Sequence, residues 1–158
     1  MRDNKAEKLG ATSGFTLLEL MIVVLFIGII AGFALPNYVR ATRNARIART
    51  ASELKSLAVA FVAYKAAYGA YPPDSHLTLP PGMSTFIRPS IWADGIPIGG
   101  TYNWEGPDGY PYAGLAIFAS GATQQTLETL DNMLDDGNLA VGKFRLGTGG
   151  RPTYIIEE

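Results

Sequence analysis

One carboxylate lies inside the most apolar stretch of the sequence, where a charge is costly. Between Phe15 and Leu35 the only polar residues are Thr16 and Glu19, and Gly14 precedes the stretch. A carboxylate well inside a bilayer costs about 2.5–3.5 kcal/mol on insertion scales, and less near the interface. Glu19 therefore needs a physical reason, and a cationic group supplied by another molecule is one such reason.

The apolar stretch itself is long enough to cross a membrane as a helix. Residues 15–35 would extend about 31 Å at 1.5 Å per residue. One interpretation is a secretory signal that is cut near Ala34. A second is an uncleaved anchor, which leaves Glu19 unexplained, and a third is an anchor whose carboxylate meets a cation from a neighbouring molecule.

The residues around this carboxylate favour the third interpretation. "G-FTLLEL", followed by an unbroken apolar run, resembles the start of prepilins, the type IV pilins and the pseudopilins of type II secretion systems. Gly14 matches the glycine before the processing site, Phe15 the first mature residue, and Glu19 the acidic residue that follows. The resemblance implies that a prepilin peptidase cuts after Gly14 and methylates the new amino group. It also implies that this cationic terminus neutralises Glu19 of a neighbouring subunit in a filament.

Two further positions match the same families. Gly28 and Pro36 stand where these families bound a stretch of helix that can melt on assembly. Proline lacks the N–H of the helical ladder, and glycine adds backbone freedom. Gly28 and Gly32 also form G-x-x-x-G, which is either a close-packing face between membrane helices or ordinary glycine usage in such a helix.

The composition excludes several kinds of chemistry. The 158 residues include no cysteine, one histidine and a net charge of −1. Disulfides, thiolate metal sites, cysteine nucleophiles and sites with two histidines are therefore excluded. The balanced charge gives no indication of nucleic-acid binding. We expect no enzymatic activity.

A run of arginines conflicts with the orientation that the resemblance implies. Arg40, Arg43, Arg46 and Arg49 follow the apolar stretch, against three cations before it. By the positive-inside tendency this predicts a cytoplasmic C-terminal region. That tendency weakens for long translocated domains, so we expect a single-pass inner-membrane protein with a cytoplasmic N-terminus and a periplasmic C-terminal domain.

The pattern divides the chain into four parts and predicts an α+β fold. These are a leader (1–14), a membrane or filament-core helix (15–36), an amphipathic helix (37–69) and a loop-rich region with a small antiparallel sheet (70–158). Apolar residues recur every seven positions in the second helix, and Gly69 is a plausible cap at its end. These residues are Ile47, Leu54, Phe61 and Tyr68, with Ala51 and Ala58 between them.

The C-terminal region contains recognisable strands and one helix. Residues 114–120, 141–146 and 151–158 read as strands, the last two joined as a hairpin, and residues 123–134 as a helix capped by Thr123. Residues 69–114 are loop-rich, with aromatic residues among glycines. We expect these aromatics to pin the loop to the core, and the alternative is a ligand platform. They are Trp92, Tyr102, Trp104, Tyr110 and Tyr112.

One cluster offers oxygen ligands. Asp131, Asp135, Asp136 and Asn138 are close in sequence, and calcium takes six to eight oxygen ligands. The resemblance adds that major pseudopilins hold calcium near their C-terminus. The EF-hand spacing is absent, however, and a turn that ends the helix accounts for these residues. The sequence therefore predicts no cofactor, with calcium the less favoured alternative.

The resemblance implies a structural subunit that works by polymerisation. We favour a type II secretion pseudopilin, because many type IV pilins close a C-terminal loop with a disulfide and this chain has no cysteine. The alternatives are a type IV pilin, or a minor tip subunit that binds a surface, DNA or cargo. A secreted soluble domain is a more distant alternative. The implied partners are other pilin-like subunits, the prepilin peptidase and an inner-membrane assembly platform.

Overall fold

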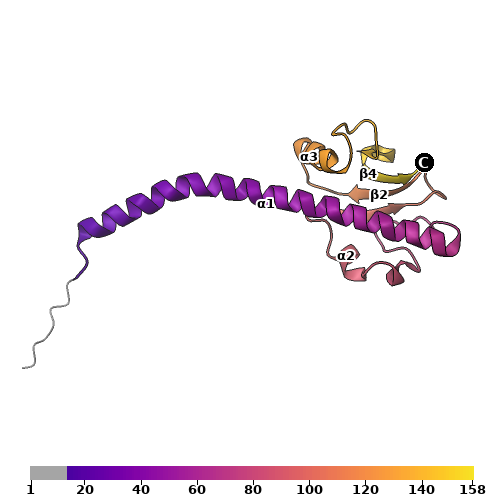
Figure 1. Ribbon diagram of the computed structural model, residues 1–158, viewed down its shortest axis with the longest axis horizontal. Helices are drawn as coiled ribbons and strands as arrows, with labels where there is room; N and C mark the ends of the chain where they lie inside the picture. The colour runs from indigo at the N-terminus through magenta and orange to yellow at the C-terminus, as the bar shows by residue number, and fades with distance from the viewer. Residues whose placement is uncertain (1–13) are drawn as a thin grey trace, which may run out of the picture. The chain divides into compact units, whose positions relative to one another are not determined.

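The computed structural model describes residues 14–158, so the predicted leader lies outside the described residues except for Gly14. The chain forms two units, one up to Arg40 and one from Ala41 to Glu158. One helix, α1 (Leu17–Tyr68), runs through the boundary and contains Pro36 (Figure 1). Each unit is best understood separately.

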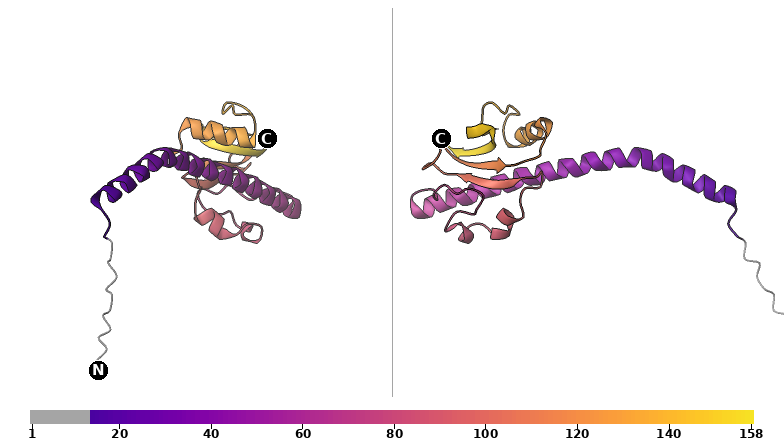
Figure 2. Two further views of the ribbon diagram at one scale, coloured as in Figure 1. Left: turned by 60° about the vertical axis from the view of Figure 1, so that its left-hand side comes forward. Right: turned by 180° about the vertical axis from the view of Figure 1, so that it is seen from behind.

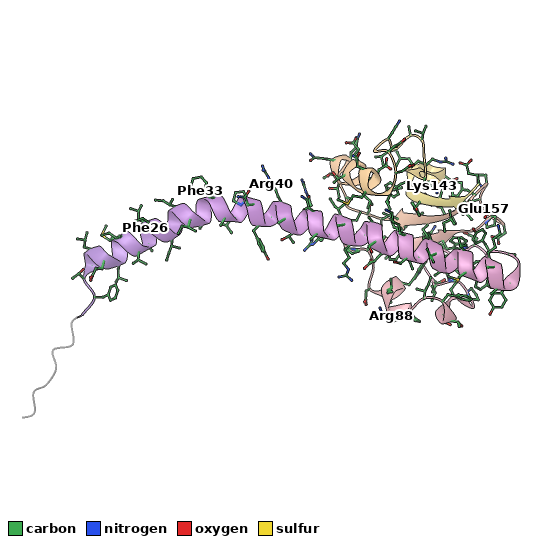
Figure 3. All side chains as sticks on the ribbon, in the orientation of Figure 1. Phe26, Phe33, Arg40, Arg88, Lys143 and Glu157 are labelled. Carbon is green, nitrogen blue, oxygen red and sulfur yellow. The ribbon has the colours of Figure 1, made fainter. Side chains whose placement is uncertain are left out.

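The apolar side chains of the first unit are exposed, with no described part of the protein packed over them. Phe26 and Phe33 are 60% and 75% exposed, and Figure 3 shows them projecting from the helix. Within the described residues, α1 is the one helix long and apolar enough to span a membrane, with a mean hydropathy of 2.7 over its most apolar stretch. None of that stretch is buried within the protein.

In the second unit, α1 buries the face that the heptad spacing predicts. Ile47, Leu54 and Phe61 are buried together with Ala51 and Ala58. The prediction was wrong for Tyr68, which is 64% exposed. Tyr68 is the last residue of the helix, and its ring contacts Tyr64 and Phe86 instead of the sheet. Gly69 ends the helix as predicted, with φ at +83° and its N–H 2.7 Å from the Lys65 carbonyl oxygen.

The sheet has four antiparallel strands in the order β1-β2-β4-β3. They are β1 (Thr101–Glu105), β2 (Ala113–Phe118), β3 (Phe144–Leu146) and β4 (Pro152–Glu157). The α+β prediction is thus confirmed, including the hairpin of the last two strands. Residues 69–114, predicted to be loop-rich, also contain short elements that the sequence pattern did not predict. That segment contains β1, α2 (Pro89–Ala93) and a short 3-10 helix, η1 (Met83–Thr85).

The face of the sheet that meets α1 carries large side chains. Trp104 pairs across the strands with Leu115, and Tyr102 with Ile117, so all four lie on one face. The Trp104 ring stacks on Phe61 of α1, with ring centroids 3.9 Å apart. Figure 2 shows the strands lying along this part of α1 from two further directions. The core of the second unit is therefore formed between α1 and the sheet.

The helix predicted at 123–134 is α3 (Gln124–Leu134). Thr123 precedes it, and its hydroxyl accepts a hydrogen bond from the Thr126 N–H at 3.3 Å, as predicted for an N-cap. Leu127 and Leu130 are buried against the core. The Lys55 ammonium donates to the Met133 carbonyl oxygen at 2.9 Å, which ties the end of α3 to α1. Between β3 and β4 lies η2 (Thr148–Gly150).

The aromatic residues of the central segment belong to the core. Trp92 is 5% exposed, and Tyr102 and Trp104 are fully buried. Both indole N–H groups are bonded to backbone carbonyl oxygens, Trp92 to Leu77 at 3.2 Å and Trp104 to Pro72 at 3.0 Å. These three rings therefore pin the segment to the core and are not exposed as a ligand platform.

Candidate functional site

The carboxylate in the apolar stretch has hydrogen-bond donors within its own chain. Both the backbone N–H and the hydroxyl of Thr16 donate to Glu19 Oε2, each at 2.8 Å. In return, the Glu19 N–H donates to the Thr16 hydroxyl oxygen at 3.2 Å. This reciprocal arrangement is a capping box at the start of α1. The sequence contains its signature, T-L-L-E, but the sequence analysis did not recognise it.

The residues of the expected processing site lie outside the helix. Gly14 precedes α1, and a side chain at its position would meet no atom within 4 Å. Phe15 is 73% exposed. The backbone between them is therefore open to an approaching enzyme in this conformation.

The two glycines further along the helix, Gly28 and Gly32, are equally open. A side chain at Gly28 or Gly32 would meet no atom within 4 Å, so their shared face has no packing partner within the described chain. At Pro36 the helix continues despite the missing N–H. The Asn37 side-chain amide donates to the Phe33 carbonyl oxygen at 3.2 Å, which adds a bond to the turn that proline weakens.

The arginine run is paired at one end only. Arg49 forms an ion pair with Glu53 at 2.8 Å. Arg40, Arg43 and Arg46 are exposed, and none of them forms an ion pair with the residues that the structure describes. These three guanidinium groups are thus available to groups outside the subunit.

Three of the four predicted oxygen ligands come together at the end of α3. Carboxylate oxygens of Asp131, Asp135 and Asp136 lie within 4.8 Å of one another. Asp131 is fully buried, and neither of its oxygens accepts a hydrogen bond from the described chain. Burial and the neighbouring charges of Asp136 and Asp135 raise the pKa of Asp131 to about 6.

The turn after α3 accounts for the other polar groups of this segment. The Asn138 N–H donates to Asp136 Oδ1 at 2.8 Å, and the Asn138 side-chain oxygen accepts from the Ala140 N–H at 3.2 Å. Asp135 accepts from the Lys143 N–H. The Gly137 N–H, in this turn, lowers the pKa of Asp131 but does not offset the burial and the two neighbouring charges. Three carboxylates without a histidine or cysteine fit a hard cation such as calcium.

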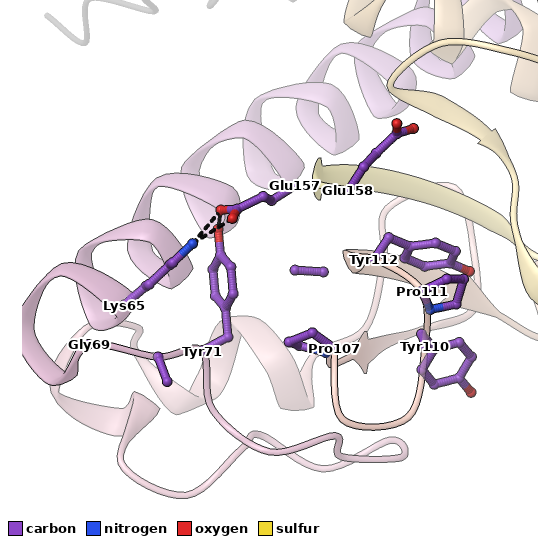
Figure 4. A pocket seen from close by; sticks show the side chains of 11 residues that line it. Lys65, Gly69, Tyr71, Pro107, Tyr110, Pro111, Tyr112, Glu157 and Glu158 are labelled. Atoms are coloured by element: carbon purple, nitrogen blue, oxygen red, sulfur yellow. Dashed lines mark hydrogen bonds and ion pairs between the residues drawn. The ribbon is translucent and has the colours of Figure 1, made fainter.

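A half-open pocket of about 430 Å³ lies where the end of α1 meets β4 (Figure 4). Tyrosine and proline side chains line it. Its charged groups already have partners, because Lys65 and Tyr71 both bind Glu157, and Arg145 binds Glu158. The pocket therefore offers no free charged group to a ligand.

Part of the chain is similar to three kinds of known protein. Two fimbrial proteins of Pseudomonas aeruginosa are 48% identical to it over 50 residues, which make up 32% of this chain and 32% of each relative. Type II secretion system core protein G of the same species is 37% identical over 60 residues, 38% of this chain and 42% of the relative. Type IV major pilin protein PilA of Myxococcus xanthus is 46% identical over 44 residues, 28% and 20% of the two chains.

These similarities cover a minority of every protein concerned. The match spans about a third of the fimbrial relatives and less than half of the other two. No family model matches the chain, and no solved structure matches it. Most of the chain lies outside each of these matches.

Proposed function

Because this chain is a type IV pilin-like protein, we propose that it is the structural subunit of a pilus-like filament, polymerised through the first half of α1. The observation that carries this proposal is an apolar helix surface that no described part of the subunit covers, with a single carboxylate in it. Exposed apolar surface of this extent indicates a membrane or protein contact. A bilayer covers it before assembly, and neighbouring helices cover it in the filament.

Processing converts the stored subunit into one that can polymerise. A prepilin peptidase cuts after Gly14 and methylates the amino group of Phe15, which creates a cation at the start of α1. In the filament this cation meets Glu19 of a neighbouring subunit. A buried ion pair is tolerated when both members are present, so the pair fixes the register of adjacent helices more than it adds stability.

Gly28 and Pro36 serve the same transition. The stretch between them lacks one backbone hydrogen bond at Pro36 and has a residue with high backbone freedom at Gly28. Its helix can therefore loosen at low cost when subunits leave the bilayer and pack. The open surface at Gly28 and Gly32 then lets a neighbouring helix approach closely.

We favour a type II secretion pseudopilin over a type IV pilin, because the chain lacks the cysteines that close a C-terminal loop in many type IV pilins. Relatives of both kinds match part of the chain, so the absence of cysteine carries this preference. The minor tip subunit is less favoured, because Trp92 and Trp104 of the segment proposed to bind a partner are buried.

In the stored state the subunit is a single-pass protein of the inner membrane, with its C-terminal unit in the periplasm. The exposed guanidinium groups of Arg40, Arg43 and Arg46 then reach lipid headgroups. In the filament they leave that interface and meet acidic groups of neighbouring subunits. These contacts offer a reason why the arginines lie on the periplasmic side, against the positive-inside tendency.

A second function, calcium binding, is favoured by one observation, the buried Asp131 without a donor. Asp131, Asp135 and Asp136 would hold the ion. A bound cation would neutralise the crowded carboxylates and tie the end of α3 to the turn that leads to β3.

Substitution of Glu19 tests the proposed assembly. Glu19→Ala should leave the processed subunit in the membrane fraction and strongly reduce the yield of filaments, because the terminal amine has no counter-charge. Glu19→Asp serves as the matched control that keeps the charge on a shorter side chain, and it should restore part of the yield. Normal filaments from Glu19→Ala would contradict this account of the carboxylate.

A further inference from the structure

We propose that Thr16 is a positioning residue for assembly, which holds one oxygen of Glu19 so that the other is presented to the amino terminus of the next subunit. This inference rests on the proposed function, since it concerns how the same ion pair forms. It gives a role in assembly to Thr16, the other polar residue of the apolar stretch.

The hydrogen bonds around Glu19 are strongly one-sided. Oε2 accepts from both the N–H and the hydroxyl of Thr16, at 2.8 Å each. No hydrogen bond to Oε1 occurs within the described residues. A carboxylate oxygen that has no donor keeps its full capacity to accept a charge-assisted bond from an ammonium group. The carboxylate is thus half satisfied within the subunit and half available outside it.

The capping box also fixes the direction of the side chain. The Thr16 hydroxyl accepts from the Glu19 N–H at 3.2 Å while it donates to the carboxylate, so side chain and backbone hold each other. Without this hydroxyl, Glu19 could adopt several rotamers, and each encounter with a neighbouring subunit would have to select one. Fixing the rotamer before the encounter lowers the entropic cost of forming the pair.

The arrangement persists through processing. Both residues lie on the mature side of the Gly14 site, and the Thr16 N–H stays an amide N–H after Phe15 becomes the terminal residue. The same donors therefore protect the carboxylate in the bilayer, where an isolated charge is costly. Thr16 makes storage possible without occupying the oxygen that the filament uses.

Carbodiimide cross-linking of the Phe15 amine to Glu19 of a neighbour tests the inference in cells that process and assemble the subunit. A membrane-permeant carbodiimide should give a dimer band with the original chain and with Thr16→Ser, which keeps the hydroxyl. Thr16→Val, of nearly the same shape, should reduce the band severalfold at equal amounts of processed subunit, as measured by mass spectrometry. Equal bands for Thr16→Val and the original chain would overturn the inference, and so would a Thr16→Ser band as weak as that of Thr16→Val.

Two controls separate this inference from the proposed function. Glu19→Gln should give no terminus-to-Glu19 cross-link, which sets the background. Absence of the cross-link from the original chain would count against the proposed filament pairing, whereas a strong cross-link that is insensitive to Thr16 would count only against the positioning residue.

An infrared measurement on the detergent-solubilised monomer does not depend on assembly or on efficient processing. Difference spectra against Glu19→Gln isolate the Glu19 carboxylate bands. Loss of the hydroxyl donor in Thr16→Val should shift these bands, and Thr16→Ser should leave them in place. Unshifted bands in Thr16→Val would overturn the inference.

Discussion

Arg151 neutralises the buried carboxylate of Glu105, which lies two strands away. Glu105 is fully buried at the end of β1, and Arg151 directly precedes β4. Arg151 Nη2 and Nε lie 2.7 and 2.9 Å from Glu105 Oε1. The other oxygen, Oε2, accepts from the Tyr112 hydroxyl at 2.7 Å. Because β1 and β4 flank β2 on opposite sides, this ion pair connects strands that do not pair with each other.

Removing the cation of this pair should cost much of the stability of the C-terminal unit. Arg151→Met should lower the free energy of unfolding by about 3–5 kcal/mol, because it leaves a buried charge without a partner. Chemical denaturation of the detergent-solubilised chain, followed by tryptophan fluorescence, measures this loss.

The matched control for that change is Arg145→Met. The Arg145–Glu158 pair has a similar distance, 2.9 Å, but its carboxylate is 72% exposed. Exposed pairs contribute about 0–1 kcal/mol, so this variant should unfold nearly as the original chain does. Equal losses in the two variants would show that burial of Glu105 does not matter.

The central aromatic residues should behave as core residues. Trp104→Ala should destabilise the second unit by about 3–5 kcal/mol, because the ring is fully buried and stacked on Phe61. Tyr68→Ala, at an exposed ring, should change the stability far less. Thermal melting of the two variants measures the difference. A Trp104→Ala protein with unchanged stability and impaired adhesion or secretion would instead favour the tip subunit.

Calcium should stabilise the protein through Asp131. Adding calcium after treatment with a chelator should raise the melting temperature, since the ion binds the folded site better than the unfolded chain. Asp131→Asn should abolish this increase, whereas Asp108→Asn, a carboxylate outside the cluster, should retain it. A melting temperature that does not respond to calcium would contradict the cation site.

Without a divalent cation, the same carboxyl group should make stability depend on pH. Its pKa is raised from 3.8 to about 6 in the folded protein, so the folded state binds the proton more tightly than the unfolded state does. Stability should therefore fall as the pH rises from about 4 to about 6. In Asp131→Asn this part of the pH dependence, followed by denaturation in a chelator, should disappear.

Features with local causes could be predicted from the sequence. The helix α3 follows from a threonine cap and leucines at helical spacing, and the end of α1 from a glycine that adopts a positive φ. The capping box of Thr16 and Glu19 is equally local and was predictable from its spacing. It went unrecognised because the resemblance to prepilins already supplied a partner for Glu19.

Features that depend on packing could not be predicted. The strand β1 alternates polar and aromatic residues, as a strand with one solvated face does, yet its polar residues Asn103 and Glu105 are buried as well. Glu105 and Arg151 are 46 residues apart, and no local pattern pairs them. The burial of Asp131 likewise depends on how α3 packs on the core, so its sequence neighbours indicated only an acidic turn.

Mass spectrometry of the mature N-terminus tests the central claim most directly. Protein purified from membranes of cells with an active prepilin peptidase should begin at Phe15 and carry one methyl group on its terminal nitrogen. A chain that begins at Leu35 would indicate a secretory signal, and one that retains Met1 would indicate a plain anchor. Either result would contradict the assignment of this chain as a processed filament subunit.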